Sequence, residues 1–262
     1  MKALSMLPPA DARGLVGVLF DLDDTVLSHG LLTREAYDAI WSLHEAGLRL
    51  VAVTGRPSGW GEVIARQWPI DGAVTENGAV HIVRDGKGVK VLFDGDAAAV
   101  AERRARLDEL VRTVAKAMPH VQLADDVHAR RSDVAWDIGE RERLDPSAVE
   151  ELASLVIAGG ARTTRSSVHL HASFERDDKA SGAIRFVHGR FGDDESAALH
   201  RWAFVGDSGN DAACFAAFKT TFGVENVRAY ARLLSVPPRW IAPSKRGAGF
   251  AEIAKAIVSS RW

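Results

Sequence analysis

Short apolar runs that alternate with longer amphipathic stretches constrain this chain more than any other feature of its sequence. The first run, residues 15–20 (LVGVLF), is nearly continuous, as in a strand that is buried on both faces. An amphipathic stretch at 33–45 follows, ends before Gly47, and leads to a second apolar run at 48–53. Strands that alternate with helices in this way form parallel sheets with helices on both faces. We therefore predict an α/β fold with a doubly wound, mostly parallel core sheet.

The alternation is interrupted in the middle of the chain, where helices and strands are grouped differently. Residues 97–118 form a long amphipathic pattern, and we expect two strands, a helix and two more strands after it. This αββαββ order favours a small antiparallel sheet covered by two helices. The parallel type of alternation resumes with an expected helix at 179–190. We predict a core domain made of residues 1–93 and 175–262, with an α+β domain inserted at 94–174.

The composition and charge exclude several classes of protein. The chain has 33 lysines and arginines against 35 aspartates and glutamates, so its net charge of −2 gives no electrostatic reason to expect a nucleic-acid partner. The single cysteine, Cys214, can form neither an internal disulfide nor a structural zinc site. No apolar run approaches the ~18 residues of a membrane span, and residues 1–13 lack the unbroken apolar stretch of a signal peptide. We expect a cytoplasmic monomer or homodimer that binds neither nucleic acid nor membrane.

Polar residues follow three of the expected strands, where a doubly wound sheet binds its ligands. Asp21 and Asp23 follow the first strand, Thr54, Gly55 and Arg56 follow the second, and Asp207 and Asp211 follow a strand expected at 202–206. Each aspartate alone also fits an ordinary helix cap. Four carboxylates brought together, however, would repel one another unless a divalent cation neutralised them. Oxygen ligands without a nearby histidine or cysteine indicate Mg²⁺.

These residues resemble the four motifs of the haloacid dehalogenase-like superfamily of phosphotransferases. Residues 21–25 (DLDDT) are similar to the first motif, and Thr54 within VAVTGR matches the second. Lys179 within DDKA matches the third motif, and residues 207–211 (DSGND) match the fourth. Residues 75–79 (TENGA) are similar to the subgroup whose α+β cap lies between the second and third motifs. That subgroup includes sucrose-phosphate, trehalose-phosphate and mannosyl-phosphoglycerate phosphatases, the Cof-type sugar phosphatases and phosphomannomutases.

The resemblance implies a role for each matched residue. Asp21 would be the nucleophile that forms an aspartyl-phosphate, and Asp23 the acid that protonates the leaving group and then activates water. The substrate would be held by Thr54, Gly55, Arg56, Lys179 and Asn210, and Mg²⁺ by Asp21, the backbone carbonyl of Asp23, Asp207 and Asp211. The chain would then be a Mg²⁺-dependent phosphatase whose partner is a small-molecule phosphate ester, that of a sugar or polyol.

Two alternative functions remain open on the same scaffold. The first is a phosphohexomutase, which would return the phosphoryl group to a sugar rather than to water. The second is a catalytically silent, phosphate-binding regulatory module, although none of the matched catalytic positions is substituted. The aspartate at position 23 favours a phosphatase or a phosphomutase, because a threonine there resembles the ATP-driven pumps and the dehalogenases lack the acid.

One pattern in the inserted domain concerns recognition of the substrate. Apolar and polar residues alternate along 131–138 and along 168–174, so that each expected strand has one apolar and one polar face. Arg131 and His169 belong to the polar sets. These polar faces either point to solvent or lie over the crevice, and in the second case Arg131 and His169 bind the substrate.

Overall fold

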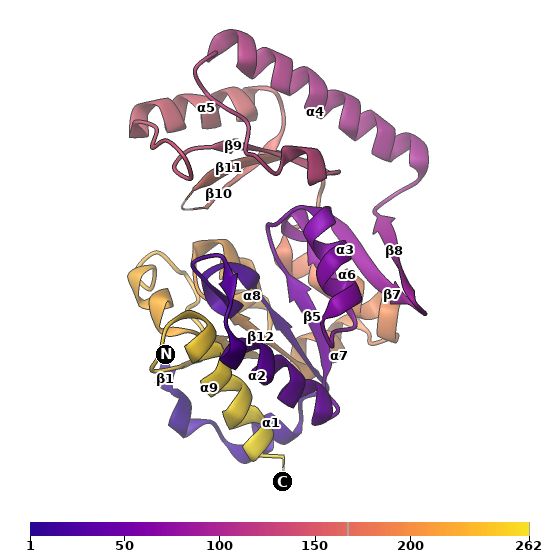
Figure 1. The fold of residues 1–262 in the computed structure, drawn as a ribbon, viewed down its shortest axis with the longest axis vertical. Helices are drawn as coiled ribbons and strands as arrows, with labels where there is room; N and C mark the ends of the chain where they lie inside the picture. Colours follow the sequence, from indigo (N-terminus) through magenta and orange to yellow (C-terminus); the bar gives the residue numbers. More distant parts are fainter. Residues whose placement is uncertain (167, 262) are drawn as a thin grey trace.

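The structure is a computed structural model that describes residues 1–166 and 168–261, and its core is built on one large sheet (Figure 1). From one edge to the other, the strands of this sheet are β1 (Lys2–Ala3), β14 (Trp240–Ile241), β13 (Thr220–Gly223), β12 (Trp202–Gly206), β2 (Gly17–Phe20), β5 (Arg49–Val53), β6 (Gly72–Thr75), β7 (Val80–Asp85) and β8 (Gly88–Phe93). The pairs from β1 to β6 are parallel, and only β7 and β8 add antiparallel pairs. The predicted doubly wound, mostly parallel sheet is confirmed.

Helices cover both faces of this sheet, because side chains along each strand alternate between two apolar layers. In β2, Val18 and Phe20 belong to the cluster on one face and Leu19 to the cluster on the other. Buried residues of α1 (Pro9–Arg13), α2 (Arg34–Glu45), α3 (Ser58–Gln67) and α9 (Arg246–Ser259) complete the first cluster, and those of α6 (Lys179–Phe191), α7 (Glu195–Arg201) and α8 (Ala212–Ala217) complete the second. Within the described part of the chain, no helix has both the length and the apolar character needed to cross a membrane.

Local signals in the sequence explain where the helices of the core begin and end. The side chain of Thr33 accepts a hydrogen bond from the Ala36 N–H and so caps the start of α2. This helix ends at Glu45, just before Gly47, whose φ of +77° suits glycine. At the start of α6, Asp178 and Ser181 form a capping box, with each side chain bound to the backbone N–H of the other.

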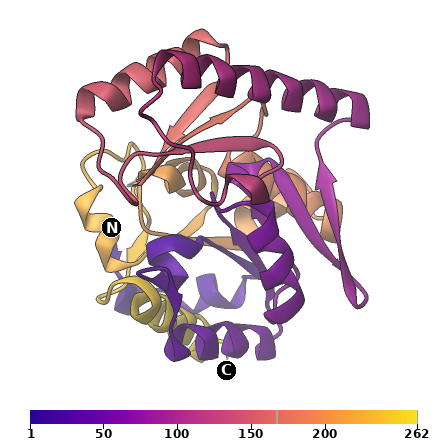
Figure 2. The ribbon, with the colours of Figure 1, turned by 45° about the horizontal axis from the view of Figure 1, so that its top comes forward.

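The inserted domain, here called the cap, lies over the core and has its own apolar cluster (Figure 2). Helices α4 (Ala97–Ala117) and α5 (Pro146–Ala158) pack on an antiparallel sheet whose order is β10 (Arg162–Arg165), β11 (His169–Ser173) and β9 (Asp133–Asp137). Among the described residues, the cap cluster shares no member with either core cluster. A separate α+β insertion is thus confirmed, while the domain limits of 1–93, 94–174 and 175–262 stay a prediction.

One of the four strands expected in the cap is reduced to a single pair of residues. Leu123 forms an isolated antiparallel bridge with Trp136, and the chain then enters a 3₁₀ turn, η4 (Val127–Ala129). The residues that follow η4 form hydrogen bonds with the core.

The other differences from prediction involve short elements. Residues 227–234, where a further unit of the alternation would fall, instead contain part of a 3₁₀ turn, η6 (Glu225–Ala229), followed by irregular chain. Only Val227 and Leu234 are buried in that stretch, which is too little apolar surface to support a helix. Several short elements were not predicted from the sequence. They are the helices α1 and α7, the strands β1, β3 (Leu27–Ser28) and β4 (Leu31–Leu32), and the turns η1 (Leu4–Met6), η2 (Leu22–Val26), η3 (Glu76–Gly78) and η5 (Gly209–Asp211). These elements are too short to produce a periodic pattern.

Two glycines within α6 provide a matched test of how this helix packs. A Cβ at Gly182 would lie 2.4 Å from the carbonyl oxygen of Gly78, whereas a Cβ at Gly189 would meet nothing within 4 Å. Alanine favours a helix over glycine by up to ~1 kcal/mol. We expect Gly189→Ala to stabilise the fold by about 0.5–1 kcal/mol, and Gly182→Ala to destabilise it by about 1–3 kcal/mol because the backbone of η3 must move. Urea unfolding followed by circular dichroism measures both changes, and equal stabilisation by both variants would contradict this packing.

Candidate active site

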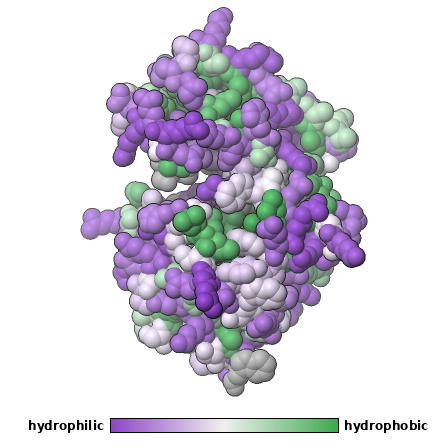
Figure 3. All heavy atoms as spheres, viewed as in Figure 1, coloured by the Kyte–Doolittle hydropathy of each residue, from purple (hydrophilic) through white to green (hydrophobic). Residues whose placement is uncertain are grey.

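The polar residues expected at the strand ends meet beside a cavity between core and cap. Strands β5, β2 and β12 are parallel neighbours, and the residues that follow them are Thr54, Asp21 and Asp207. The cavity has a volume of about 670 Å³, and residues of both domains line it. In the space-filling view, an indentation separates cap and core on the left side of the molecule (Figure 3). This is the crevice in which a doubly wound sheet binds ligands.

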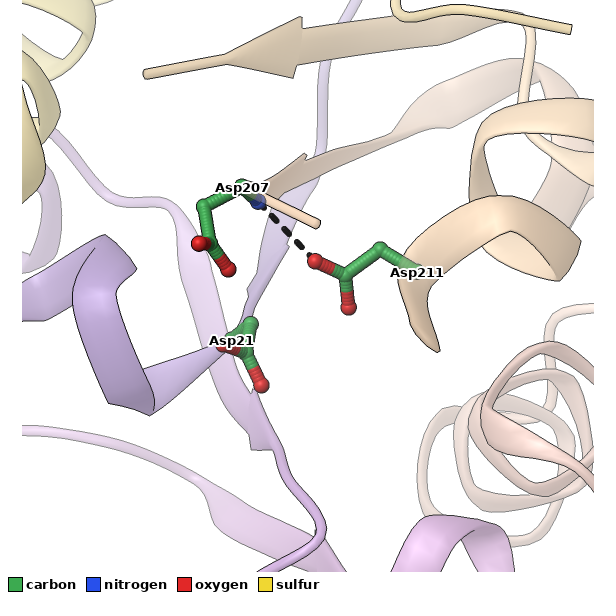
Figure 4. A group of neighbouring side chains, drawn as sticks. All are labelled: Asp21, Asp207 and Asp211. Carbon is green, nitrogen blue, oxygen red and sulfur yellow. Dashed lines mark hydrogen bonds between the residues drawn. The ribbon is translucent and has the colours of Figure 1, made fainter. Parts of the chain in front are cut away.

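Three buried carboxylates lie together at this edge of the sheet (Figure 4). Asp21, Asp207 and Asp211 each offer one oxygen, and these oxygens lie within 4.8 Å of one another. Burial raises the pKa of Asp21 well above its ordinary value and that of Asp207 to about 7, and repulsion from Asp211 adds to both shifts. Oxygen donors that are this close and this poorly hydrated fit a divalent cation, which would neutralise them. The cluster is therefore able to bind a metal ion.

Lys179 supplies a positive charge inside the same cluster. Its Nζ donates hydrogen bonds to Oδ1 of Asp21 at 2.6 Å and to Oδ1 of Asp211 at 2.8 Å. Burial acts to lower the pKa of this ammonium group, but the two carboxylates outweigh burial and hold the pKa above its usual range. Lys179 is the first residue of α6. The helix N-cap formed by Asp178 holds the backbone at this position and so helps to place the ammonium group.

Asp211 is held on both of its oxygens. Its Oδ1 accepts the Lys179 hydrogen bond, while its Oδ2 accepts from the N–H groups of Asp207 at 2.9 Å and Ser208 at 3.3 Å (Figure 4). For the side chain of Asp21, in contrast, the hydrogen bond from Lys179 to Oδ1 is the only one formed with the described residues. Asp21 is thus the carboxylate with an unengaged oxygen among the described contacts, whereas Asp211 orients the Asp207 loop through the N–H groups of Asp207 and Ser208.

Asn226 is a functional candidate that sequence reasoning missed. Its side-chain Nδ2 donates to Oδ2 of Asp207 at 2.7 Å and to the carbonyl oxygen of Asp24 at 3.0 Å. Its Oδ1 accepts from the N–H of Arg246 at 3.1 Å, which fixes the orientation of the amide. Asn226 therefore joins the loop after β2 to the loop after β12. The available signal was its position shortly after β13, which is a fourth strand end.

Asp23 and Arg56 form a bidentate ion pair on the wall of the cavity. Arg56 Nε donates to Oδ2 of Asp23 at 2.8 Å and Nη2 to Oδ1 at 2.6 Å. The guanidinium group also lies 4.4 Å from the centre of the Trp60 ring. Thr54, which is fully buried, accepts a hydrogen bond from the Arg56 N–H through its hydroxyl oxygen at 3.1 Å. Arg56, which follows β5, thus holds the side chain of Asp23, which follows β2.

The cap covers the cavity with histidines and arginines that are paired with carboxylates. His169 Nε2 lies 2.7 Å from Glu140 Oε2, and His171 Nδ1 lies 3.0 Å from Asp133 Oδ2. Burial lowers the pKa of His171, and the contact with Asp133 only partly offsets that shift. Arg130, whose side chain is 1% exposed, binds Asp133 at 2.9 Å and also reaches the core.

The structure places Arg131 differently from the prediction. Its guanidinium group points away from the cavity and pairs with Glu62 of α3 at 2.5 Å, and its side chain is 45% exposed. The alternation that put Arg131 on the polar face holds only within β9, which begins at Asp133. The neighbouring Arg130 lines the cavity instead. Arg131 therefore does not face the cavity, contrary to the prediction, whereas His169 lines it.

The remaining predicted residues fall into three groups around the cavity. Those that line it are Asp21, Asp23, Gly55, Arg56, His169, Asp207 and Asn210. Lys179 lines an adjoining cavity of about 310 Å³, which shares Asn210 and His171 with the first. Thr54 and Asp211 are fully buried and lie outside both linings.

Comparison with known proteins shows what the chain is similar to. Residues 18–101, which include Asp21, Asp23 and Thr54, match the family model described as haloacid dehalogenase-like hydrolase. No curated protein matches the chain in sequence. The first segment of the core is therefore similar to haloacid dehalogenase-like hydrolases, and the solved structures below share the fold of nearly the whole chain.

Three solved structures illustrate the shared fold. A Thermoplasma acidophilum protein is 16% identical and has a TM-score of 0.72, covering 93% of this chain and 98% of its own. The sucrose-phosphatase of Synechocystis, solved with sucrose and phosphate, is 15% identical with a TM-score of 0.65, covering 94% and 98%. A putative HAD/Cof-like hydrolase from Plasmodium vivax is 19% identical with a TM-score of 0.65, covering 96% and 99%. Cap and core therefore occur together in these proteins.

The contacts of Asn226 predict an effect on metal binding. We expect Asn226→Ala to weaken Mg²⁺ binding by about 10–100-fold, because partners of this kind orient the ligand carboxylate. Isothermal titration of the metal-free protein with Mg²⁺, in the absence of substrate, measures the affinity. Glu225→Ala is the matched control, since its side chain faces Lys245 at 3.6 Å rather than Asp207. An unchanged affinity in Asn226→Ala would show that Asp207 needs no such support.

Proposed function

We propose that this protein is a Mg²⁺-dependent phosphatase that hydrolyses a small sugar or polyol phosphate through an aspartyl-phosphate intermediate. The observation that carries the proposal is the contrast between two carboxylates on one loop. Asp21 is buried and paired with Lys179, as suits a nucleophile held in place. Asp23 is 45% exposed on its side chain and lines the cavity, as suits a group that exchanges protons with substrate and water.

The metal ion has a clear place in this proposal. Asp21, Asp207 and the backbone carbonyl of Asp23 would hold Mg²⁺, with Asp211 acting through the Asp207 loop and Lys179. When bound, Mg²⁺ would supply the positive charge that neutralises the carboxylates and the phosphoryl oxygens. The support is the donor set itself, which consists of buried carboxylates whose oxygens lie within 4.8 Å.

The first half-reaction transfers the phosphoryl group to the protein. A carboxylate oxygen of Asp21 attacks phosphorus in line, and the bond from phosphorus to the leaving oxygen breaks as the new bond forms. Asp23 gives its proton to that leaving oxygen, which departs as an alcohol. Lys179 and Asn210 would hold the phosphoryl oxygens, together with the N–H group of Gly55, while Thr54 would fix this turn by accepting a hydrogen bond from the Arg56 N–H.

The second half-reaction returns the nucleophile to its starting state. Asp23, now a carboxylate, takes a proton from water, and the water oxygen attacks phosphorus. The bond from phosphorus to Asp21 breaks, which releases inorganic phosphate and restores both aspartates to their original protonation.

Arg56 controls when Asp23 can act. While Arg56 holds both oxygens of Asp23, neither oxygen is free to carry the proton that the leaving group needs. A phosphate dianion in the cavity competes with Asp23 for this guanidinium group. We infer that substrate binding moves Arg56 from Asp23 to the phosphate and so frees Asp23 beside the leaving oxygen.

The charges of the cap support a neutral, hydroxyl-rich leaving group. Among the described residues, each cationic or histidine side chain with which the cap lines the cavity has a carboxylate partner: Arg130 with Asp126 and Asp133, Arg165 with Glu150, His169 with Glu140, and His171 with Asp133. A second anionic group on the substrate would need a free cation. Hydroxyl groups, in contrast, can donate to such carboxylates and accept from such cations.

Substitution of the two aspartates tests the mechanism. We expect Asp21→Asn to lower kcat by more than about a hundredfold, because an amide is a poor nucleophile and loss of acid–base help alone costs ~10²–10⁴-fold. Asp23→Asn should be nearly as damaging while leaving Mg²⁺ affinity intact, since Asp23 would bind the metal through its backbone. Release of inorganic phosphate from glucitol 6-phosphate, without a bisphosphate activator, is the assay, and it also separates a phosphatase from a phosphohexomutase.

The control for this experiment is Asp38→Asn, on the exposed face of α2, which should leave kcat unchanged. Retention of more than a hundredth of the wild-type kcat by Asp21→Asn would exclude covalent catalysis at that position. No release of phosphate from any ester by the wild-type protein would favour the silent regulatory module.

A matched pair of substrates tests the proposed leaving group. Glucitol 6-phosphate and 6-phosphogluconate differ only at C1, which is a hydroxymethyl group in the first and a carboxylate in the second. We expect kcat/KM to be at least about tenfold higher for glucitol 6-phosphate, because an unpaired charge in the cavity costs more than the ~1.4 kcal/mol that tenfold represents. Steady-state kinetics with both esters provides the measurement. A preference for the carboxylate would show that one of the cap cations changes its partner.

A further inference from the structure

A buried carboxylate that the proposed mechanism does not use lies between core and cap. Glu76 follows β6, is 2% exposed, and accepts hydrogen bonds from backbone N–H groups of both domains. Its Oε1 accepts from Ser58 at the start of α3 at 2.9 Å. Its Oε2 accepts from Ser132 at 2.6 Å and Asp133 at 3.0 Å, and the N–H of Arg131 lies 3.0 Å from both oxygens. One side chain of the core thus binds three consecutive amides of the cap.

The backbone of Glu76 is held in an uncommon conformation. Its φ is +51°, and that of Asn77 is +56°, so two successive non-glycine residues lie in the left-handed region. Such conformations persist where the surrounding contacts outweigh their cost, and they are frequent at sites with a function. Here the conformation directs the Glu76 side chain toward the cap. The burial of Glu76 and the nearby Asp133 raise its pKa to about 7, while the N–H donors favour the charged form.

Other contacts fasten the same cap segment to the phosphate-binding loop. The hydroxyl of Ser58 donates to the carbonyl oxygen of Ala129 at 3.1 Å. Arg130 Nη1 donates to the carbonyl oxygen of Gly55 at 3.1 Å. Ala129 also packs so closely on α3 that a Cβ at Gly59 would lie 3.1 Å from its own. Cap residues 129–133 are therefore seated on the turn that follows Thr54.

We propose that Glu76 is a positioning residue that seats the cap over the catalytic cavity. It touches no reacting atom, and it acts by holding residues 131–133 so that Arg130 and His171 stand over Asp21 and Asp23. The exposed pair of Arg131 and Glu62 joins the same two domains but contributes little, because solvent screens it. Loss of the Glu76 contacts loosens the cap without unfolding it, since the described cap residues have an apolar cluster of their own.

Hydrogen exchange with Glu76→Gln tests this seating directly. The glutamine amide has almost the same shape but places an NH₂ group among N–H donors, so at least one oxygen's hydrogen bonds are lost. At pH 8, above the pKa of Glu76, we expect the amides of residues 131–133 to exchange at least about tenfold faster than in the wild type, as for loss of hydrogen bonds to a charged group. Glu62→Gln is the matched control and should accelerate the same amides less than about fivefold.

A kinetic readout separates positioning from general damage, and this part of the test rests on the proposed function. We expect kcat/KM of Glu76→Gln to fall at least about tenfold for glucitol 6-phosphate and less than about threefold for p-nitrophenyl phosphate, which lacks the hydroxyl groups that the cap would contact. Equal losses on both esters would overturn the positioning role. If Glu76→Gln exchanges faster at residues 131–133 while the wild-type protein shows no phosphatase activity, the seating is supported and the proposed function is rejected.

A measurement on the wild-type protein covers the case in which Glu76→Gln fails to fold. If Glu76 joins the two domains, the amides of Ser58, Arg131, Ser132 and Asp133 open together. Their exchange rate constants, each divided by the intrinsic rate for its sequence, are then equal and depend on urea in the same way. Opening of the Ser58 amide independently of the three cap amides would overturn the proposal, as would unchanged exchange at 131–133 in a folded Glu76→Gln variant.

Discussion

The burial of the Lys179 ammonium group between Asp21 and Asp211 is the constraint on which the rest of the structure depends. A buried charge is tolerated only when a partner of opposite sign lies within reach. The three carboxylates of the cluster come from two strand ends, β2 and β12. The lysine comes from the start of α6, which follows the cap in the sequence. Both segments of the core must therefore be folded together before the charges can pair. One ammonium group cannot neutralise three carboxylates, which is why the same cluster also suits a divalent cation.

Much of the fold and the centre of the site follow from local patterns in the sequence. The apolar run at 15–20 and the amphipathic stretch at 97–118 have the lengths and periods of a buried strand and a long helix, and they form β2 and α4. The convergence of Asp21, Thr54 and Asp207 follows from the geometry of parallel sheets alone, since neighbouring strands end at the same edge. Residues close to strand ends were predictable for that reason.

The rest depends on how distant segments pack, which no local pattern records. Arg130 and Arg131 are neighbours with the same chemistry, and which of them lines the cavity depends on the start of β9 at Asp133 and on the contacts of residues 129–133 with the core. Asn226 is bound to Asp207 through a loop after β13, nineteen positions away. The pairing of Arg56 with Asp23 likewise joins two loops that only the folded sheet brings together.

The contacts of Glu76 have a consequence for how such an enzyme changes over evolutionary time. The groups that Glu76 binds in the cap are main-chain N–H groups, which every residue except proline provides. The side chains of residues 131–133 can therefore be exchanged without loss of the attachment. Because the described cap residues also have an apolar cluster of their own, the polar surface of the cap can change in sequence while its attachment to the core stays the same. Substitutions on the polar surface of the cap can in this way accumulate without changes in the core.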